Sequence, residues 1–250
     1  MKEAFESIAG IDINDPNETK YKFPTSTEYE TLPKKYLVIA KEYMDAYTSG
    51  KELRNSIVKR GIDISISLVV VIFILPLLFI FFGILIKLES RGPILFKQIR
   101  SGHDNKLFWC YKFRTMFMND QSDILQATRC DKRVTKIGRF LRKNSLDEFP
   151  QFFNVLKGDM SLVGPRPHML KLDETYAPKI DKYLKRLAAK QGLTGWAQVN
   201  GFRGETNNIQ FMKKRIEHDV WYLENWSVWL DIKIIFLTVL LFFKNEPGTY

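Results

Sequence analysis

Two adjacent carboxylates, Asp147 and Glu148, stand in the stretch KNSLDEFPQFF over Lys143–Phe153. Apolar residues recur at helical intervals from Leu146 to Leu156, so the pair is predicted to lie at the start of a helix. Carboxylates at such a position commonly satisfy free backbone N–H groups. An aspartate carboxylate can also attack phosphorus and form an acyl phosphate. The pair by itself leaves both interpretations open.

The local pattern contains two candidate helix caps. Ser145 followed three residues later by Glu148 matches a capping box. Pro150 fits best in a first helical turn, which would make Asp147 the cap instead. Gly158 supplies a C-terminal stop. In either arrangement the two acids lie at a helix N-terminus.

The residues on both sides of the acidic pair favour an anionic ligand. Cations crowd DKRVTKIGRFLRK before the pair, and one arginine stands between two prolines in KGDMSLVGPRP after it. Guanidinium groups bind phosphate oxygens in paired geometry. A carboxylate can attack phosphorus only if cations neutralise the charge that builds up on the phosphoryl oxygens. These arginines are Arg133, Arg139, Arg142 and Arg166.

The two acids need not share a role, because successive helical residues point about 100° apart. If Asp147 is the nucleophile, Glu148 can hold Mg²⁺ through hard oxygen atoms, with or without other acids. The three histidines do not cluster and there is no CxxC, so a structural zinc site is not expected. Cys110 and Cys130 are predicted to be thiols rather than a disulfide.

Length and charge limit the number of domains and the kinds of ligand to be considered. A chain of 250 residues accommodates one sizeable domain, with or without appendages. Its formal net charge of +10 suits nucleic acid, an anionic membrane surface or a phosphorylated substrate, and charge alone does not choose among them.

One segment, Ile64–Ile86, contains no charged residue. At about 1.5 Å per helical residue it is long enough to cross a hydrocarbon core of about 30 Å, so we predict membrane insertion rather than a buried core helix. Pro76 lies near its middle and is expected to bend the helix. Both flanks carry lysine and arginine, which favours a hairpin that returns to the same face. A kinked single span is the alternative.

The C-terminal part also indicates a membrane surface. Aromatic residues Trp221, Tyr222, Trp226 and Trp229 precede the apolar run Ile232–Phe243, which is too short to span a bilayer. An interfacial helix anchored by amphipathic rings explains both features. Ordinary packing in a core is the rival interpretation.

The fold class predicted from these patterns is mainly α with a small β-hairpin. The hairpin is expected from the short runs GPILFKQIR and LFWCYKF, joined by SGHDNK. We expect a re-entrant membrane helix hairpin plus a compact domain with interfacial amphipathic helices, which the family resemblance described below implies to be a cytoplasmic catalytic domain. The predicted parts are a polar N-terminal extension (1–50, with one helix at about Pro33–Thr48), the membrane helix (51–90), the catalytic domain (91–220) and the interfacial helix (221–250).

The run DKRVTKIGRFLRKNSLDEFPQFFNVLKGDMSLVGPRP resembles the signature of the bacterial sugar transferases, which are monotopic polyprenyl-phosphate phosphoglycosyl transferases. The resemblance extends back through KRGIDISISLVVVIFILPLLFIFFGILIKLESRGPILFKQ and YKFRTM. It continues through GLTGWAQVNGFRGET and DVWYLENWSVWLDIKII. It therefore covers about Lys59–Phe243 in the order of the family.

The resemblance implies a role for each matching residue. Asp147 would attack the β-phosphorus of a UDP-sugar and expel UMP, and Glu148 would help to place Mg²⁺. Undecaprenyl phosphate would then attack the covalent phosphosugar and leave as a polyprenyl diphosphate sugar. The cations expected to contact the substrates are Lys112, Arg114, Arg133, Arg142, Arg166 and Arg203.

The stretch NGFRGET, Asn200–Thr206, resembles the branch that uses UDP-glucose or UDP-galactose to begin exopolysaccharide or capsule repeats. From the residues alone, glycine-rich backbone around Arg203 and Glu205 suits either a sugar-diphosphate loop or a plain turn with an exposed ion pair. Gln191 departs from the family, whose members usually have proline before GLTG. This difference is expected to loosen a turn without touching the chemistry.

The family's hydrophobic hairpin with its central proline is similar to Ile64–Ile86, which supports re-entry. The resemblance implies the bacterial inner membrane, with the catalytic domain on the cytoplasmic face. Anionic lipids are expected partners, nucleic acid is not, and a homo-oligomer or other glycosyltransferases of the pathway are further candidates. Long members of the family carry additional N-terminal membrane helices and a soluble domain. About fifty polar residues stand in that place here, so any regulatory role of those parts is expected to be absent or supplied by another chain.

Two other functions fit part of the pattern. A membrane-tethered basic protein that binds nucleic acid or anionic lipid would explain the charge, but not the acidic pair between arginines. A hydrolase with a phosphoaspartate intermediate would use water as acceptor. The membrane segment and the C-terminal helix, which would hold a lipid phosphate at the bilayer edge, argue against the hydrolase.

Overall fold

A computed structural model describes residues 53, 56–122, 124–128, 131–204 and 208–244. The predicted N-terminal extension and its helix lie outside these residues, as do Cys130 and Glu205. Helices dominate the described part, as predicted. The α-helices are α4 (Ile57–Val69), α5 (Leu75–Glu89), α6 (Lys136–Lys143), α7 (Gln151–Lys157), α8 (Leu170–Tyr176), α9 (Trp196–Val199), α10 (Ile209–Glu224) and α11 (Val228–Lys244). The strands are β1 (Leu95–Ser101), β2 (Leu107–Phe113), β3 (Met160–Val163) and β4 (Gln191–Thr194).

The predicted hairpin is confirmed. Strands β1 and β2 pair antiparallel from Leu95 opposite Phe113 to Ser101 opposite Leu107. The connection contains Asp104 and Asn105 with φ angles of 53° and 60°. Asp and Asn tolerate this left-handed region better than most side chains do. The ladder holds Lys112 at the C-terminal end of β2.

A second, parallel pair was not predicted. Strands β3 and β4 are joined by backbone bonds that continue past their ends, since Gly164 N–H donates to Thr194 at 2.9 Å and Gly192 N–H donates to Pro165 at 2.8 Å. A Cβ atom on Gly164 would meet the Lys190 carbonyl oxygen at 2.4 Å, so only glycine fits this approach. The pairing fixes the backbone of the GPRP turn that carries the proline-flanked arginine.

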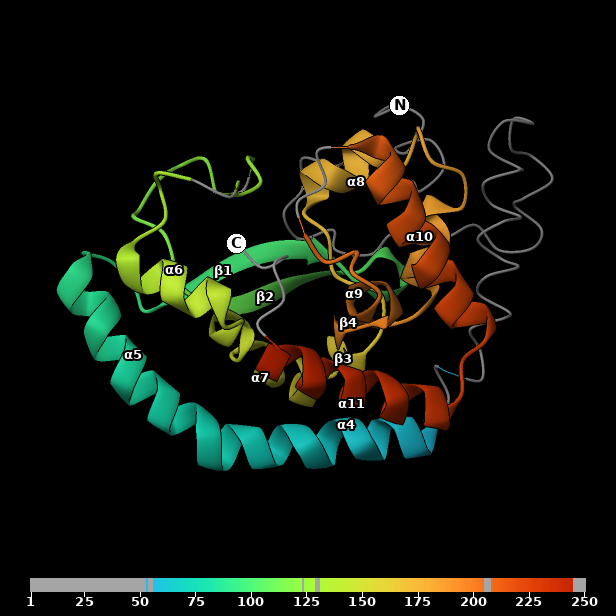
Figure 1. Ribbon diagram of the computed structural model, residues 1–250, viewed down its shortest axis with the longest axis horizontal. Helices are drawn as coiled ribbons and strands as arrows, with labels where there is room; N and C mark the ends of the chain where they lie inside the picture. Colours follow the sequence, from blue (N-terminus) through green and yellow to red (C-terminus); the bar gives the residue numbers. More distant parts are fainter. Residues whose placement is uncertain (1–52, 54–55, 123, 129–130, 205–207, 245–250) are drawn as a thin grey trace.

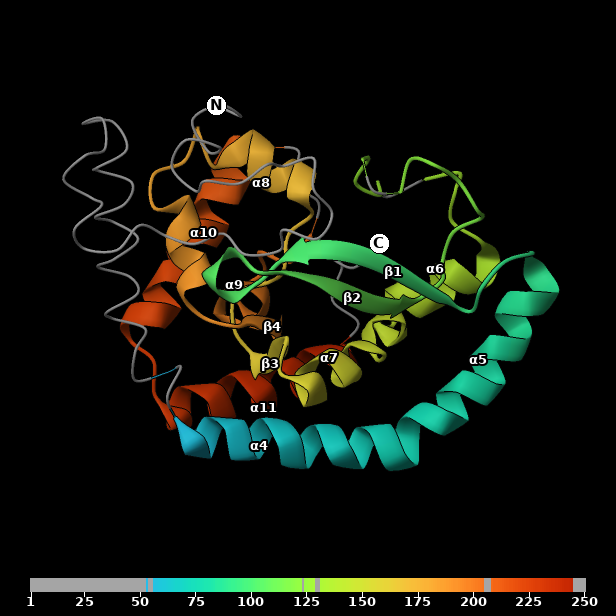
Figure 2. The ribbon, with the colours of Figure 1, turned by 180° about the vertical axis from the view of Figure 1, so that it is seen from behind.

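The long apolar segment forms one bent helix. A π-helical stretch, η2 (Val70–Ile74), separates α4 from α5 directly before Pro76. Proline supplies no N–H for the helical ladder, and a π turn is a recognised site of bending. Figures 1 and 2 show that the sheets and the remaining labelled helices lie on the inner side of the bend. Among the described residues, Ile57–Glu89 is the one helix long and apolar enough to cross a membrane.

The two arms of this helix contact the rest of the protein differently. Arm α4 presents buried polar groups: Lys59 Nζ donates to Asp231 at 2.7 Å and to the Val163 carbonyl at 2.9 Å. Asp63 accepts from the Leu162 N–H at 2.9 Å. Arm α5 packs mainly through apolar side chains against the hairpin and α6, and its last residue, Glu89, accepts from the backbone N–H groups of Lys136 at 2.6 Å and Ile137 at 2.9 Å. Polar contacts therefore predominate between the first arm and the other described elements, and hydrophobic burial predominates for the second arm.

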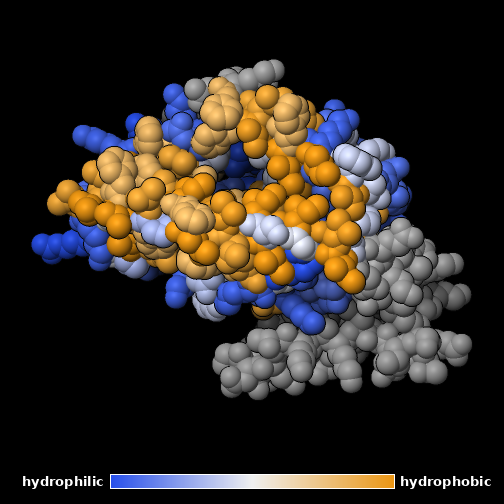
Figure 3. Space-filling model, turned by 90° about the horizontal axis from the view of Figure 1, so that it is seen from below, coloured by the Kyte–Doolittle hydropathy of each residue, from blue (hydrophilic) through white to orange (hydrophobic). Residues whose placement is uncertain are grey.

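Exposed apolar side chains of the bent helix (α4, η2 and α5) and of α11 form what we call the apolar face. Figure 3 shows that they cover most of one side of the molecule and surround a hollow with a hydrophilic floor. Helix α11 contains the predicted run Ile232–Phe243 and lies beside α4. Large members of this face, each at least 40% exposed, include Ile72, Phe73, Leu77, Ile80, Phe81, Ile84, Trp229, Phe236, Val239 and Phe243.

Candidate active site

The acidic pair lies in a 3₁₀ turn, η4 (Leu146–Glu148), one turn ahead of α7. Both predicted caps are wrong. Ser145 has a φ angle of 54° and its side chain caps nothing, because an N-cap residue needs an extended backbone. Pro150 itself occupies the N-cap position of α7, so neither acid satisfies the first turn of that helix. The capping interpretation therefore does not account for the two carboxylates.

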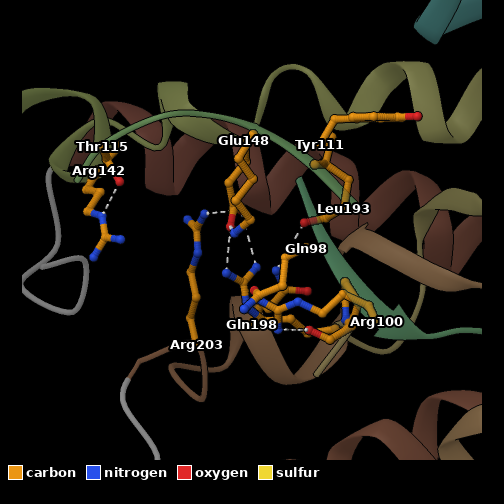
Figure 4. Close-up of polar contacts among 12 residues, drawn as sticks. Gln98, Arg100, Tyr111, Thr115, Arg142, Glu148, Leu193, Gln198 and Arg203 are labelled. Carbon is orange, nitrogen blue, oxygen red and sulfur yellow. Dashed lines mark hydrogen bonds and ion pairs between the residues drawn. The ribbon is translucent and has the colours of Figure 1, made fainter. Parts of the chain in front are cut away.

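Glu148 is held by three cations from three separate segments. Its Oε1 atom accepts from Lys112 at 2.7 Å and from Arg166 at 2.6 Å. Its Oε2 atom accepts from Arg166 at 3.2 Å and from Arg203 at 3.0 Å. Figure 4 shows Glu148 and Arg203 pointing toward each other from different parts of the chain. Strand β2, the GPRP turn and the loop after α9 thus converge on one carboxylate.

These contacts determine the protonation of Glu148. Burial alone would raise the pKa of this carboxyl group. The positive charges of Arg166, Lys112 and Arg203, together with the hydrogen bonds from Arg166, hold its pKa well below the ordinary value. Glu148 is therefore an anion at neutral pH, and its negative charge holds the three cations in place around the site.

Asp147 is buried to a similar extent, with 8% of its surface exposed against 6% for Glu148. Among the described residues, no hydrogen bond or ion pair reaches its carboxylate. Its pKa is raised, first by burial and also by the negative charge of Glu148, although Lys112 and Arg142 act in the opposite direction. A carboxylate with a raised pKa and no bound partner is more basic and more available for attack than an ordinary aspartate.

Arg142 reaches the site from α6. Its Nε atom donates to Thr115 Oγ1 at 2.8 Å. Figure 4 shows the terminal nitrogens of its guanidinium group pointing away from Thr115. Both residues line a cavity of about 220 Å³ that also contains Asp147 and Glu148. Arg142 is therefore placed to contact an anion that enters this cavity.

Two of the predicted cations have other contacts. Arg114 lines the cavity, but its guanidinium group donates to the carbonyl oxygens of Ser90 at 2.8 Å and Arg91 at 2.7 Å, just after α5. Arg133 is not among the residues that line the cavity. It forms a two-pronged ion pair with Asp131, whose pKa it lowers to about 2 through side-chain hydrogen bonds. The structure thus brings together Lys112, Arg142, Arg166 and Arg203 and leaves Arg133 outside.

Among the other residues that line the cavity, three have ionisable side chains that were not predicted: Arg100, His168 and Arg215. Burial, followed by the charges of nearby arginines, holds the pKa of His168 well below its usual range, so this imidazole is neutral. His168 directly follows the GPRP turn, which is a signal that could have identified it. Arg215 had no such signal, because a cation in the polar pattern of a helix such as α10 usually faces solvent.

Glu148 was also predicted to hold Mg²⁺, with or without other acids. Among the described residues, no group of three or more histidine, cysteine or acidic side chains surrounds a common point. Mg²⁺ is usually bound by one or two carboxylates, waters and substrate phosphates rather than by a cage of protein groups. An ionised glutamate fits that mode, in which the ion arrives with a diphosphate. Glu148 is the residue that would hold it.

Residues 54–245 match the family model described as bacterial sugar transferase. The chain belongs to this family. The resemblance stated from the sequence is therefore confirmed, over more than half of the chain.

Several curated relatives are similar to this family member. A "UDP-glucose:undecaprenyl-phosphate glucose-1-phosphate transferase" of Klebsiella pneumoniae is 49% identical over 195 residues, which cover 78% of this chain and 42% of the relative. A protein of Caulobacter vibrioides with the same name is 47% identical over 182 residues, covering 72% of this chain and 68% of the relative. The "Exopolysaccharide production protein PSS" of Rhizobium leguminosarum is 41% identical over 189 residues, covering 74% and 94%. The chain spans less than half the length of the Klebsiella relative.

Proposed function

We propose that this sugar transferase moves a hexose 1-phosphate from a UDP-sugar, UDP-glucose or UDP-galactose, to undecaprenyl phosphate and releases UMP. The observation that carries the proposal is the contrast within the acidic pair. Asp147 is a buried carboxylate with no hydrogen-bond or ion-pair partner among the described residues, next to a carboxylate that contacts three cations. The names of the relatives, which act on UDP-glucose and undecaprenyl phosphate, support the same reaction.

In the first step a carboxylate oxygen of Asp147 attacks the β-phosphorus of the UDP-sugar. A bond forms between that oxygen and phosphorus, and the bond from phosphorus to the bridging oxygen breaks. The bridging oxygen leaves with the electron pair as part of UMP. The positive charges of Arg142, Arg166 and Lys112 offset the charge that accumulates on the phosphoryl oxygens.

In the second step a phosphate oxygen of undecaprenyl phosphate attacks the same phosphorus. The bond to Asp147 breaks, the carboxylate is restored, and the product is a polyprenyl diphosphate sugar. The exclusion of bulk water from Asp147 by burial favours a lipid acceptor over hydrolysis. This would be the first membrane step in building an exopolysaccharide, a capsule or another glycoconjugate.

Mg²⁺ bound with the diphosphate would withdraw charge from its oxygen atoms and make phosphorus easier to attack. Glu148 keeps its carboxylate ionised and oriented for this purpose. It also holds Arg166 and Arg203 beside the position that the diphosphate would take.

We further propose that the bent helix re-enters the membrane and returns to the cytoplasmic face of the bacterial inner membrane. Supporting observations are the bend before Pro76, the apolar face shared by α4, α5 and α11, and the polar contacts of α4 with the catalytic part. Single cysteines placed at Lys51 and Lys97, in a Cys110→Ser, Cys130→Ser background, can be labelled in intact cells with an impermeant thiol reagent. We expect neither to react until the cells are opened. Reaction of only one of them in intact cells would contradict re-entry.

The reaction is tested with purified protein, a panel of UDP-sugars and Mg²⁺, by measuring UMP. Without lipid we expect release of at most one UMP per enzyme molecule, and continuous turnover once undecaprenyl phosphate is added. Continuous release without lipid would identify a hydrolase. No release from any UDP-sugar, together with salt-sensitive binding of nucleic acid or anionic vesicles, would favour the basic binding protein, for which the names of the relatives give no support.

A further inference from the structure

Arg203 differs from the other two cations on Glu148 in how its backbone is held. Lys112 belongs to the β1–β2 ladder, and Arg166 lies between two prolines beside the β3–β4 pair. Arg203 instead follows Gly201, which has a φ angle of +88°, in a loop outside any helix or strand. Its side chain is also the most exposed of the three, at 32% against 20% for Lys112 and for Arg166. The loop is fixed before Arg203 by the Phe202 N–H, which donates to the Ala197 carbonyl at 2.9 Å. A contact that spans Arg203 itself is needed if this side chain is to reach Glu148 reproducibly.

The buried side chain of Arg215 supplies that support. This residue is 2% exposed and comes from α10. Its Nε atom donates to the carbonyl oxygen of Phe202 at 2.7 Å, and its Nη2 atom donates to the carbonyl oxygen of Gly204 at 2.6 Å. These carbonyls belong to the residues immediately before and after Arg203. One guanidinium group therefore holds the backbone carbonyl groups on both sides of Arg203.

The surroundings of Arg215 make this contact costly. Burial, and the charges of Arg166 and Arg186, lower its pKa to about 10 although Asp219 acts in the opposite direction. A buried cation among other cations destabilises the fold unless its donors are satisfied. An apolar side chain would fill the same space at lower cost. The two carbonyl contacts are what an apolar side chain could not provide, since only a rigid fork of donors holds two acceptors at once.

We infer that Arg215 is a positioning residue that fixes the loop of Arg203 for binding the diphosphate of the UDP-sugar. This inference rests on the proposed function and adds to it the residue that supports one wall of the site. Arg203 can exchange its contact with Glu148 for a substrate phosphate only if its backbone stays in place. Arg215 acts on the substrate through Arg203.

The inference is tested by a double-mutant cycle on UMP release, using Arg215→Lys, Arg203→Ala and the combination of both. Lysine keeps the charge but cannot hold two carbonyl groups in a fixed fork. We expect Arg215→Lys to reduce kcat/KM on the order of tenfold, mainly by raising KM for the UDP-sugar. In the Arg203→Ala background the same change should have little further effect, because the group that it positions is already gone.

The exposed neighbour Lys214, changed to Met, is the matched control on α10 and should behave as the wild type. Effects of Arg215→Lys and Arg203→Ala that multiply independently would overturn the inference, as would wild-type kinetics in Arg215→Lys. If Arg215→Lys does not fold, Arg215→Gln, which keeps one donor nitrogen, replaces it; failure of both to fold would show a purely structural role and also overturn the inference. A wild-type protein that releases no UMP would instead contradict the proposed function.

Discussion

The Asp147 side and the Glu148 side of the site are one residue apart and equally removed from solvent, yet they are chemically opposite. On the Glu148 side, three cations lie in hydrogen-bonding contact and lower the pKa. On the Asp147 side, cations act only at a distance, and burial raises the pKa. Contact, rather than burial, therefore decides which carboxyl group has the lowered pKa and which has the raised pKa. The fold achieves this difference by turning the two side chains toward different neighbours within one 3₁₀ turn.

The largest expected effect comes from removing the unpartnered carboxylate. Asp147→Asn should lower UMP release on the order of 10⁴-fold or more, with or without lipid, because an amide cannot attack phosphorus in its place. Initial rates of UMP formation from UDP-glucose measure this effect. Near-normal turnover would remove Asp147 as the nucleophile.

Glu148→Gln should also be severe, with a loss of UMP release on the order of 10²–10³-fold, because three cations lose their common anion.

The effect of the same substitution on stability gives a second comparison of the two acids. Removing one partner of a buried ion pair costs about 3 kcal/mol or more, so Glu148→Gln should lower the free energy of unfolding by that order. Asp147→Asn should leave it unchanged or raise it, since it removes an unpaired buried charge. Denaturant titration of both variants in the same detergent measures the difference, and equal losses would contradict the contrast.

Removing the charge of Glu148 and removing the charge of Lys112 should shift the pH dependence of kcat/KM in opposite directions. The raised pKa of Asp147 means that kcat/KM should fall on the acidic side at a higher pH than for an ordinary aspartate, whose pKa is about 3.9. Removing the charge of Glu148 in Glu148→Gln should move this limb to lower pH, because that charge raises the pKa of Asp147. Lys112→Met should move it to higher pH, because the lysine lowers the same pKa. Shifts in one common direction would show that another group controls the limb.

The smallest effect is expected from the contact that orients Arg142. Thr115→Val removes the acceptor of its Nε atom while keeping the shape of the side chain, and should raise KM for the UDP-sugar about threefold. Arg142→Ala, which removes the cation itself, should raise KM by on the order of tenfold. Steady-state kinetics of the two variants and of their combination test whether Thr115 acts through Arg142. Unchanged kinetics in Arg142→Ala would remove this arginine from the site.

Local patterns of the sequence predicted part of this arrangement. The β1–β2 hairpin and the apolar helix with its bend at Pro76 follow from alternation and composition within short windows. The β3–β4 pair does not, because its four-residue strands lie far apart in the chain and carry no alternation. The cap predicted at Ser145 failed because the backbone there is left-handed. Neither the parallel pairing nor this backbone conformation is visible in the types of the neighbouring residues.

The candidate active site was likewise predicted only in part from the sequence. The acidic pair and most of its cations were predicted from residue types and from the family resemblance. The assignment of the cations to one acid was not, because it depends on three segments meeting around Glu148. Arg133 was predicted to contact a substrate, but it forms an ion pair with Asp131, two residues earlier in the chain. Arg215 was missed because its burial depends on where α10 packs.

The central claim is that Asp147 becomes covalently attached to the phosphosugar, and mass spectrometry of the intact protein tests it most directly. Wild-type protein mixed with UDP-glucose and Mg²⁺, without lipid and quenched rapidly, should gain the mass of one hexosyl phosphate. Peptide mapping should place that mass on Asp147, Asp147→Asn should not acquire it, and undecaprenyl phosphate should discharge it as the lipid product forms. Product formation at the normal rate with no added mass at residue 147 would contradict the account.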